Sequence, residues 1–300
     1  MDQLNARTDD FEQNRPRLRA LAYRMLGSAH EADDAVQETW LRLERTDTSE
    51  VENLPGWLTT VLTRVCLNLL RARESRREEP EDERLPAVAE RADPEQEAVL
   101  ADSVGLAMLV VLDTLGPAER VAFVLHDMFA VPFDDIAPMI DRTPAAVRQL
   151  ASRARRRVKG TPAVPEADLA RQHRVVDAFL AAARRGDFEA LLALLDPDVV
   201  LRADAAAGPS HLPLVLQGVR NVANGAILAS KRVMVSQPAL VDGHAGLVMA
   251  PLGRLQRALS FTFTGDRISG IEVIAEPDRL QALDLAVLDD LADMPGLRHD

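Results

Sequence analysis

Seven basic residues and no acidic one lie between Arg142 and Lys159, interleaved with small and apolar side chains. On a helix, residues four apart share a face, so the long polar side chains gather opposite Val147, Leu150 and Ala151. Arginine and glutamine on such a face can donate hydrogen bonds to base edges in the major groove of DNA. The candidates for base contact are Arg148, Gln149, Ser152, Arg153 and Arg156. The candidates for holding phosphates are Arg142, Arg155, Arg157 and Lys159.

The same stretch has the signals of two helices joined by a tight turn. Apolar residues at helical spacing occupy positions 133–140, and Asp141 and Arg142 make the turn. Thr143 is a good N-cap, and Pro144 suits the first helical position, where no N–H needs a partner. This pattern predicts a helix-turn-helix. The alternative is an ordinary helical hairpin with a solvated basic face, and the turn lacks the frequent glycine.

The distribution of charge matters more than its sum. The 300-residue chain has a formal net charge of −12, which is unusual for a protein that binds DNA. Between Glu78 and Asp102, however, ten acidic residues face only Arg84 and Arg91, a local net charge of −8. Nucleic-acid contact depends on the local electrostatic field and not on the net charge of the chain. The basic segment from 142 to 159 is therefore still expected to bind DNA.

Three amphipathic helices are expected in the first 78 residues. They run from Phe11 to Leu26, from Ser28 to about Arg45, and onward from Leu54, with a polar loop at 46–53. The single cysteine, Cys66, lies among apolar neighbours and is expected to be a small core residue. The second helix presents an acidic and polar outer face that includes Asp33, Asp34, Gln37 and Glu38.

Several classes of protein are excluded by simple features. The longest apolar run, Val104 to Leu112, is too short to span a bilayer. The polar, acidic first residues do not form a signal peptide. With one cysteine, neither a disulfide nor a cysteine-based zinc site can form within the chain. We therefore expect a cytoplasmic protein with no membrane contact, metal or cofactor.

Two blocks carry a family resemblance. The strings LAYRMLGSAHEADDAVQETWLRL and LPGWLTTVLTRVCLNLLRAR resemble region 2 of the extracytoplasmic-function sigma factors, a branch of the sigma-70 family. LDTLGPAERVAFVLHDMFAVPFDDIAPMI followed by TPAAVRQLASRARRRV is similar to region 4. The resemblance covers about the first 160 residues. It implies an all-α region 2 at 1–78, an acidic flexible linker at 79–102, and an all-α region 4 helix-turn-helix at 103–160.

The resemblance implies a role for each candidate residue. The protein would bind core RNA polymerase through the β′ clamp helices and the β flap, and recognise −10 and −35 promoter elements. The polymerase-binding positions would be Asp33, Asp34, Gln37, Glu38 and Trp40, although an acidic helix face is more often only solvated. The loop at 46–53, with Asn68 and Arg71, would contact the single-stranded −10 element, and the −35 contacts would fall on the basic face described above. Trp57 could stack on a base but is at core spacing.

The acidic linker leaves two interpretations open. It contains Pro80, Pro86 and Pro94 and has no sustained apolar period, so flexibility is expected. In the resembling family such linkers run through the RNA-exit path of the polymerase, where negative charge mimics nucleic acid. The alternative is a solvated tether.

The chain changes character after Gly160, and residues 161–300 predict an α+β cone. Helices are expected at Glu166–Arg185 and at Phe188–Leu195, followed by a curved antiparallel sheet with turns at Asp242-Gly243 and Gly265-Asp266. The string AAARRGDFEALLALLDPDVVLRAD resembles the SnoaL-like, NTF2-like domains that extend a subset of these sigma factors. The strands are expected at Val199–Arg202, Leu214–Gln217, Val233–Val235, Ala239–Val241, Ala245–Met249, Ala258–Thr264 and Ile268–Ile274.

The extension departs from the pattern of that subset. Asp204-Ala205-Ala206-Ala207-Gly208 replaces an Asp-Gly-Gly-Gly motif, and only Arg84-Leu85-Pro86 remains of a linker motif. Glu276-Pro277-Asp278-Arg279-Leu280 stands where the family has a closing Asn-Pro-Asp-Lys-Leu motif. These departures leave open whether the extension activates or inhibits. A helical tail after Leu280, with apolar residues from Leu283 to Leu291, is expected to pack on the sheet or the sigma core.

The extension is expected to regulate the sigma core by intramolecular contact and not to be an enzyme. SnoaL-like enzymes place an acid–base pair in the mouth of the cone, and the candidates here are scattered: Asp204, His211 and His244. The alternative function is a SnoaL-type enzyme or small-molecule sensor tethered to a DNA-binding module. The sequence names no ligand, promoter consensus or inducing signal.

Overall fold

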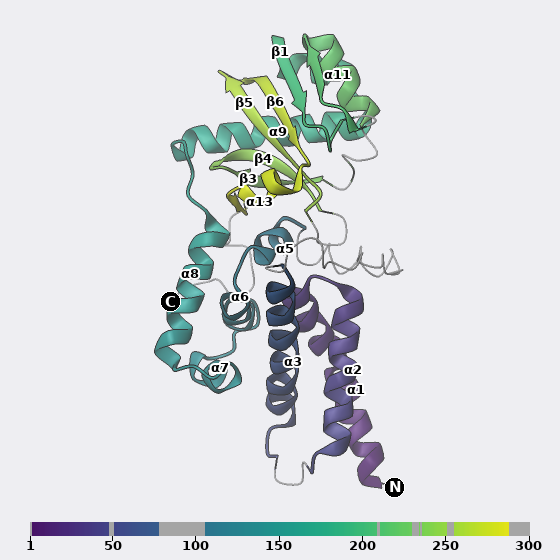
Figure 1. Cartoon of the computed structure of the whole chain (residues 1–300), viewed down its shortest axis with the longest axis vertical. Coiled ribbons are helices and arrows are strands. Elements are labelled where there is room, and N and C mark those ends of the chain that lie inside the picture. The colour runs from purple at the N-terminus through teal and green to yellow at the C-terminus, as the bar shows by residue number, and fades with distance from the viewer. Residues whose placement is uncertain are drawn as a thin grey trace. The chain divides into compact units, whose positions relative to one another are not determined.

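The computed structural model describes residues 2–47, 51–77, 106–208, 211–229, 234, 236–250 and 255–287 (Figure 1). They fall into two compact units. The first contains the described residues up to 77 together with Leu112–Arg155, and the second contains residues 106–111 and the described residues from Arg156 on. The expected linker at 79–102 lies outside the described residues.

Three helices begin the first unit, as predicted, although the first starts nine residues before the expected Phe11. α1 spans Asp2–Leu26, α2 spans Ala29–Arg45 and α3 spans Leu54–Arg77, and all three pack on one another. α1 ends at Gly27, whose φ of +73° suits a residue without a Cβ. Ser28 then caps α2 as expected, since its side chain accepts a hydrogen bond from the Glu31 backbone N–H at 3.4 Å.

The core of these helices confirms the apolar pattern. Leu18, Leu21, Leu58 and Leu62 are buried, and so is Cys66. Burial raises the pKa of the Cys66 thiol to about 12, against a smaller lowering effect of the Arg120 charge, so the thiol stays protonated. Cys66 is therefore a small core residue, as its apolar neighbours predicted.

The helix-turn-helix is present in the first unit. Residues 106–111 of α5 (Leu106–Asp113) belong to the second unit and its last two residues to the first, and α6 (Pro117–Phe123) continues into a π-helical segment, η2 (Val124–Met128). α7 (Phe133–Met139) and α8 (Pro144–Lys159) follow, and the end of α8 enters the second unit (Figure 1). Thr143 Oγ1 accepts from the Ala146 N–H at 3.2 Å, which confirms the cap. Asp141 takes the place of the missing turn glycine with a φ of +55°, because aspartate tolerates the left-handed region better than most residues.

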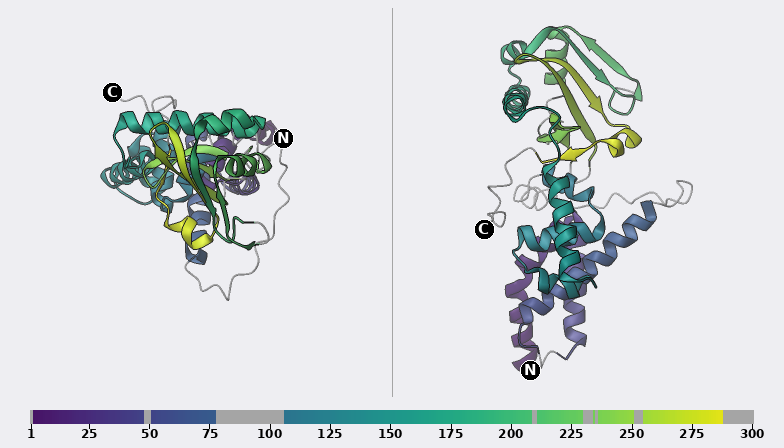
Figure 2. Two further views of the ribbon diagram at one scale, coloured as in Figure 1. Left: turned by 90° about the horizontal axis from the view of Figure 1, so that it is seen from above. Right: turned by 90° about the vertical axis from the view of Figure 1, so that its left-hand side faces the viewer.

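The second unit packs helices against one mixed sheet. Its strand order is β2-β1-β6-β5-β4-β3-β7, and α9, α10 and α11 lie on the sheet (Figure 2). Phe179 of α9 meets Phe261 of β5 edge-on, with ring centroids 5.5 Å apart, in the centre of this core. The α+β class expected for the extension is confirmed. The helices are α9 (Glu166–Arg185), α10 (Phe188–Leu194), α11 (Val219–Leu228) and α13 (Pro277–Ala282). The strands are β1 (Leu195–Ala203), β2 (Leu214–Gln217), β3 (Ser236–Val241), β4 (His244–Met249), β5 (Arg257–Thr264), β6 (Arg267–Ile274) and β7 (Leu285–Ala286).

Four details of the extension differ from expectation. The sheet is not wholly antiparallel, because β1 and β6, which are far apart in the sequence, pair as parallel strands. Helix α11 was not expected, although Val222, Ala223 and Ala226 form its buried stripe. Leu285 lies in a strand that pairs with β3, not in a helix, and Leu291 is outside the described residues. Apart from Met234, the strand expected at 233–235 also falls outside them.

One buried carboxylate fastens the end of β1 to the turn after β6. Asp204 is 5% exposed and accepts hydrogen bonds from the backbone N–H groups of Ala275 at 2.8 Å and Glu276 at 3.0 Å. It also accepts from the Ala207 N–H at 2.9 Å, and Arg279 lies 3.6 Å away. Burial alone would raise the pKa of Asp204, but these donors and the Arg279 charge outweigh it and hold the pKa below its usual value. Asp204 thus joins the two segments whose sequences depart from the family motifs, residues 204–208 and residues 276–280.

Asp204 makes a pH-dependent contribution to the stability of the second unit. Because its folded-state pKa is depressed, the contribution is fully present above the unfolded pKa and is lost as pH falls through the folded value. We expect Asp204→Asn to cost about 2 kcal/mol at pH 7, the range for hydrogen bonds to a charged group. Amide hydrogen exchange of residues 268–280 should quicken, and its dependence on pH below about 5 should weaken after correction for intrinsic rates.

The exposed Asp198 provides a control for this substitution. Asp198→Asn removes the same charge from β1, six residues before Asp204, and should leave the exchange of residues 268–280 unchanged. Equal protection in wild type and Asp204→Asn would show that Asp204 does not fasten the two strands.

Candidate nucleic-acid interface

All the predicted base-contact residues lie on one exposed face of α8. The face is possible because Val147, Ala151, Ala154 and Val158 are fully buried on the opposite side. The helical period therefore turns the long polar side chains between them outward, with the exception of the half-buried Arg155. The exposed residues are Arg148, Gln149, Ser152, Arg153 and Arg156.

Two arginines of this face are supported by residues outside α8. The Nε of Arg153 donates to Glu119 Oε1 of α6 at 2.7 Å. The guanidinium of Arg148 lies 5.8 Å above the ring of Phe133 in α7, a cation–π contact. Phe133 in turn stacks on His126, with ring centroids 3.7 Å apart. These contacts hold the arginines at the surface, where their remaining N–H groups can reach another molecule.

Arg155 has a different partner from the one expected. Its Nε lies 2.5 Å from Asp127 Oδ1, and the Asp127 side chain is only 2% exposed. A carboxylate buried this deeply needs a charged partner, so Arg155 fastens α8 to η2. The sequence alone did not point to this pair, because the two residues are 28 positions apart. The phosphate role expected from its sequence position is therefore not the role that its geometry favours.

The polar face of α2 is in place, and its charges are paired. Asp33, Asp34 and Gln37 are exposed, whereas Glu38 and Trp40 are half-buried. Trp40 packs on the Phe11 ring, with centroids 4.9 Å apart, so only part of it faces outward. The ion pairs of this face join Arg19 to Asp33 at 2.5 Å and Arg42 to Glu38 at 2.8 Å, and His30 Nδ1 lies 3.1 Å from Asp34 Oδ2.

The candidates for single-strand contact lie one helical turn apart on α3. Asn68 and Arg71 are both exposed, on the side of the helix away from the buried Leu62 and Cys66. The loop that precedes α3 is described only in part, since residues 48–50 lie outside the described ranges.

A buried arginine joins the helix-turn-helix to the three-helix bundle. Arg120 of α6 is 2% exposed, pairs with Asp113 Oδ1 at 3.1 Å, and directs Nη2 at the Arg24 carbonyl oxygen at 3.5 Å. A Cβ at Gly27 would lie 3.3 Å from the same nitrogen, so glycine leaves room for the guanidinium.

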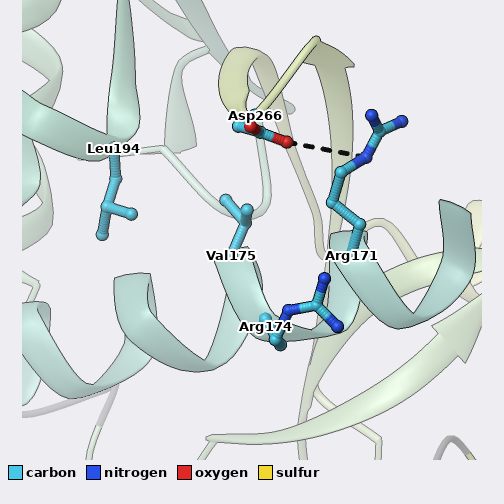
Figure 3. A pocket seen from close by; sticks show the side chains of 5 residues that line it. All are labelled: Arg171, Arg174, Val175, Leu194 and Asp266. Atoms are coloured by element: carbon cyan, nitrogen blue, oxygen red, sulfur yellow. Dashed lines mark ion pairs between the residues drawn. The ribbon is translucent and has the colours of Figure 1, made fainter. Parts of the chain in front are cut away.

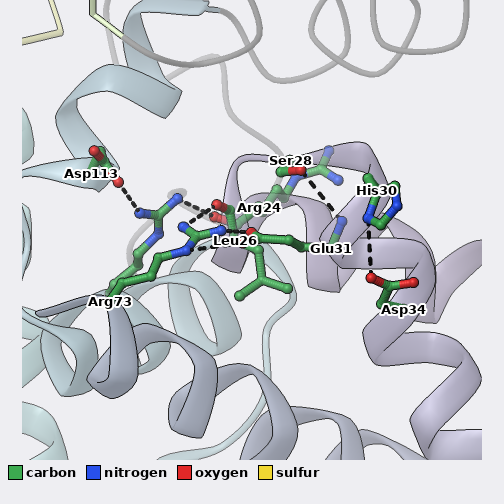
Figure 4. Close-up of polar contacts among 9 residues, drawn as sticks. Arg24, Leu26, Ser28, His30, Glu31, Asp34, Arg73 and Asp113 are labelled. Carbon is green, nitrogen blue, oxygen red and sulfur yellow. Dashed lines mark hydrogen bonds and ion pairs between the residues drawn. The ribbon is translucent and has the colours of Figure 1, made fainter. Parts of the chain in front are cut away.

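Two further arginines hold helices of the first unit together, and one of them adds to this junction. Arg73 donates to the Leu26 carbonyl oxygen at 2.8 Å and pairs with Glu31, next to the cap of α2 (Figure 4). Arg64 of α3 donates to the Pro138 carbonyl oxygen of α7 at 3.1 Å. Arg120 and Arg64 therefore join the helix-turn-helix to the three-helix bundle, whereas Arg73 joins the helices of the bundle to one another.

The candidate catalytic residues of the extension do not line the hollow found among its described residues. A hollow of about 530 Å³ on the second unit is lined by Arg171, Arg174, Val175, Leu194 and Asp266 (Figure 3). His211 is exposed with a φ of +56°, and His244 is half-buried at the start of β4. Asp204 is occupied by its backbone donors. None of the three lines the hollow.

Among the residues that the structure describes, no group of three or more His, Cys, Asp or Glu side chains is placed to hold a metal ion. No helix in the described part of the chain is long and apolar enough to cross a membrane.

Comparison with known proteins gives matches over both units. The model of Sigma-70 region 2 matches residues 11–76, and that of Sigma-70, region 4 matches residues 106–158. A probable ECF RNA polymerase sigma factor, SigI of Mycobacterium tuberculosis, is 35% identical over 271 residues, covering 88% of this chain and 91% of the relative. ECF RNA polymerase sigma factor SigJ of the same species is 35% identical over 287 residues, covering 90% and 92%. The crystal structure of M. tuberculosis SigJ aligns over 91% of this chain and 97% of its own, at 29% identity and a TM-score of 0.45.

Proposed function

Because the chain belongs to the extracytoplasmic-function sigma factors of the sigma-70 family, we propose that it reads the −35 promoter element through α8 and the −10 element through α3. As a sigma factor it binds core RNA polymerase and directs promoter-specific initiation of transcription. Its place of action would then be the cytoplasm. The observation that carries the −35 assignment is the single exposed face of α8, where arginine and glutamine donors converge.

The chemistry of that face suits the major groove. Arg148 and Arg153 offer planar groups that can bind guanine O6 and N7 together, and Gln149 can bind adenine in the same bidentate way. Arg156, one turn further along, would meet the phosphate backbone or a base at the edge of the site. The negative net charge of the protein does not prevent this, because residues 142–159 include seven basic side chains and no acidic one.

On α3, Asn68 and Arg71 would meet the −10 element after strand opening. An amide and a guanidinium can hydrogen-bond to unpaired bases and contact the backbone of a single strand. Both side chains are exposed, as this role requires.

Polymerase docking would use the acidic and polar face of α2. The carboxylates of Asp33, Asp34 and Glu38 are compatible with a basic surface of the β′ clamp helices, and Gln37 adds a neutral donor and acceptor. Trp40 would contribute only the edge that Phe11 leaves uncovered.

The extension would regulate the protein by holding both ends of region 4. Within the second unit, the Ala107 N–H of α5 donates to Gln237 Oε1 of β3 at 3.1 Å. The Val287 N–H, just after β7, donates to the Val158 carbonyl oxygen of α8 at 2.9 Å. Hydrogen bonds from this edge of the sheet to α5 and α8 can favour one arrangement of region 4 over another, and this effect needs no catalysis. The scattered positions of Asp204, His211 and His244 do not favour the enzymatic alternative.

The promoter assignment predicts a loss of base selectivity. Arg148→Ala should cost about 1–3 kcal/mol of discrimination at one base pair of the −35 element, because a bidentate contact is lost. Initiation by the reconstituted holoenzyme would be measured on promoters with single −35 substitutions. Arg174→Ala removes an exposed arginine of α9 and should leave selectivity unchanged. Selectivity that is the same in Arg148→Ala and wild type would contradict the assignment.

The docking assignment predicts weaker holoenzyme formation after charge reversal. The double variant Asp33→Lys, Asp34→Lys places two positive charges on the exposed face of α2. The pair Asp9→Lys, Asp10→Lys makes the same change of net charge on the exposed surface of α1 and serves as the matched control. Affinity for core polymerase should fall at least tenfold in the first and little in the second, consistent with short-range charge complementarity. Equal losses in both would mean that only net charge matters, and circular dichroism checks folding.

The regulatory assignment predicts an effect from the far edge of the sheet. Gln237→Ala removes the acceptor of the Ala107 N–H, so hydrogen exchange in α5 should quicken and transcription from one promoter should change at least about twofold. Gln217→Ala alters an exposed glutamine at the opposite sheet edge and should do neither. If the amide hydrogens of α5 exchange faster while transcription stays the same, the hydrogen bond between Gln237 and Ala107 is structural and does not regulate.

A further inference from the structure

A carboxylate outside the helix-turn-helix holds one of the proposed base-reading arginines. Glu119, in the first turn of α6, accepts a hydrogen bond from Arg153 Nε at 2.7 Å. The Glu119 side chain is 17% exposed and that of Arg153 is 49% exposed. The pair therefore lies at the surface of α8 that faces outward, with its acidic member in the more protected place.

The geometry of the pair leaves the reading end of Arg153 available to DNA. A guanidinium carries five N–H donors, and the bond to Glu119 uses the one on Nε. Guanine O6 and N7 are bound in the major groove by two parallel donors, which the Nη groups can supply. A bond at Nε fixes the plane of the guanidinium before DNA arrives, so less side-chain freedom is lost on binding.

The support under Glu119 is rigid. The next residue, Arg120, is buried and pairs with Asp113 at 3.1 Å, so the first turn of α6 is fixed in the interior of the first unit. The pair of Arg155 and Asp127 differs from it, because there the carboxylate is only 2% exposed and the arginine binds a buried group. Glu119 therefore contacts an arginine of the exposed face of α8, whereas Asp127 contacts a half-buried one.

The charge of Glu119 has a second effect. A carboxylate 2.7 Å from Arg153 offsets the attraction of that arginine for any phosphate. Affinity for DNA of arbitrary sequence depends on such attraction, whereas discrimination depends on base contacts. Glu119 thus lowers non-specific affinity while it keeps Arg153 in a reading orientation.

We propose that Glu119 is a positioning residue for promoter recognition, which orients Arg153 toward a base pair and suppresses its non-specific attraction to phosphate. The proposal rests on the proposed role of α8 at the −35 element. It assigns to a residue of α6 a share in sequence specificity that α8 alone would otherwise hold.

The test uses holoenzyme reconstituted with the full-length chain and four variants: Glu119→Ala, Glu119→Gln, Arg153→Ala and the double alanine variant. Binding is measured to promoter DNA, to promoters with each −35 base pair replaced, and to unrelated duplex DNA over a range of salt. Arg153→Ala should lose about 5- to 150-fold discrimination at one base pair, as expected for a bidentate contact. Glu119→Ala should lose about 3- to 10-fold at that same base pair, and the double variant should match Arg153→Ala because the two residues act as a unit.

Glu119→Gln separates orientation from charge. Its amide oxygen can still accept from Nε, so discrimination should stay within about twofold of wild type, while unrelated DNA binds more tightly with a steeper salt dependence. A purely structural role for Glu119 would not move the salt dependence.

Each outcome has a distinct meaning. If Arg153→Ala loses discrimination and Glu119→Ala keeps it, the positioning role is wrong and the proposed function stands. If Arg153→Ala itself keeps discrimination, α8 does not read DNA through Arg153, and the proposed function fails at that residue. If Glu119→Ala does not fold, Glu119→Gln decides, because unchanged affinity for unrelated DNA would overturn the proposed effect of charge.

Discussion

The first unit depends on a positive charge placed where water cannot reach it. The guanidinium of Arg120 is buried among α1, α5 and α6, with Asp113 at 3.1 Å and the Arg24 carbonyl oxygen at 3.5 Å. An arginine in this position is costly unless its partners stay in place, so the partners and the helices that carry them are constrained together. Gly27 is part of the same constraint, because a side chain there would crowd the guanidinium. The helix-turn-helix thus shares one polar anchor with the three-helix bundle.

The arginines near the helix-turn-helix serve three different purposes that depend on their partners. Arg155, beside the buried Asp127, holds α8 to the interior. Arg148, over the Phe133 ring, keeps its full charge because an aromatic face does not neutralise it. Arg153, beside Glu119, keeps its donors but loses part of its attraction to phosphate. If α8 reads DNA as proposed, these local partners would explain how a chain with a net charge of −12 presents such a surface and also limits indiscriminate binding.

The sequence predicted features that repeat along one helix and missed features that join distant elements. The face of α8 could be predicted because buried Val147 and Ala151 alternate with arginines at the helical period. The roles of Glu119 and Asp127 could not, since they follow from tertiary contacts of residues that resemble ordinary surface charges. The parallel pairing of β1 with β6 was missed for the same reason, because no turn connects the two strands. Leu285 was expected in a helix, but pairing with β3 outweighed its local helical pattern.

The central claim is that this chain gives core RNA polymerase its choice of promoter. The most direct test maps the 5′ ends of transcripts made from fragmented genomic DNA by core polymerase with and without the purified full-length protein. The account predicts new, discrete start sites that appear only with the protein and share one upstream −35 sequence, whose substitution abolishes them. Identical start sites in the two reactions would contradict the account, because α8 would then contribute nothing to where transcription begins.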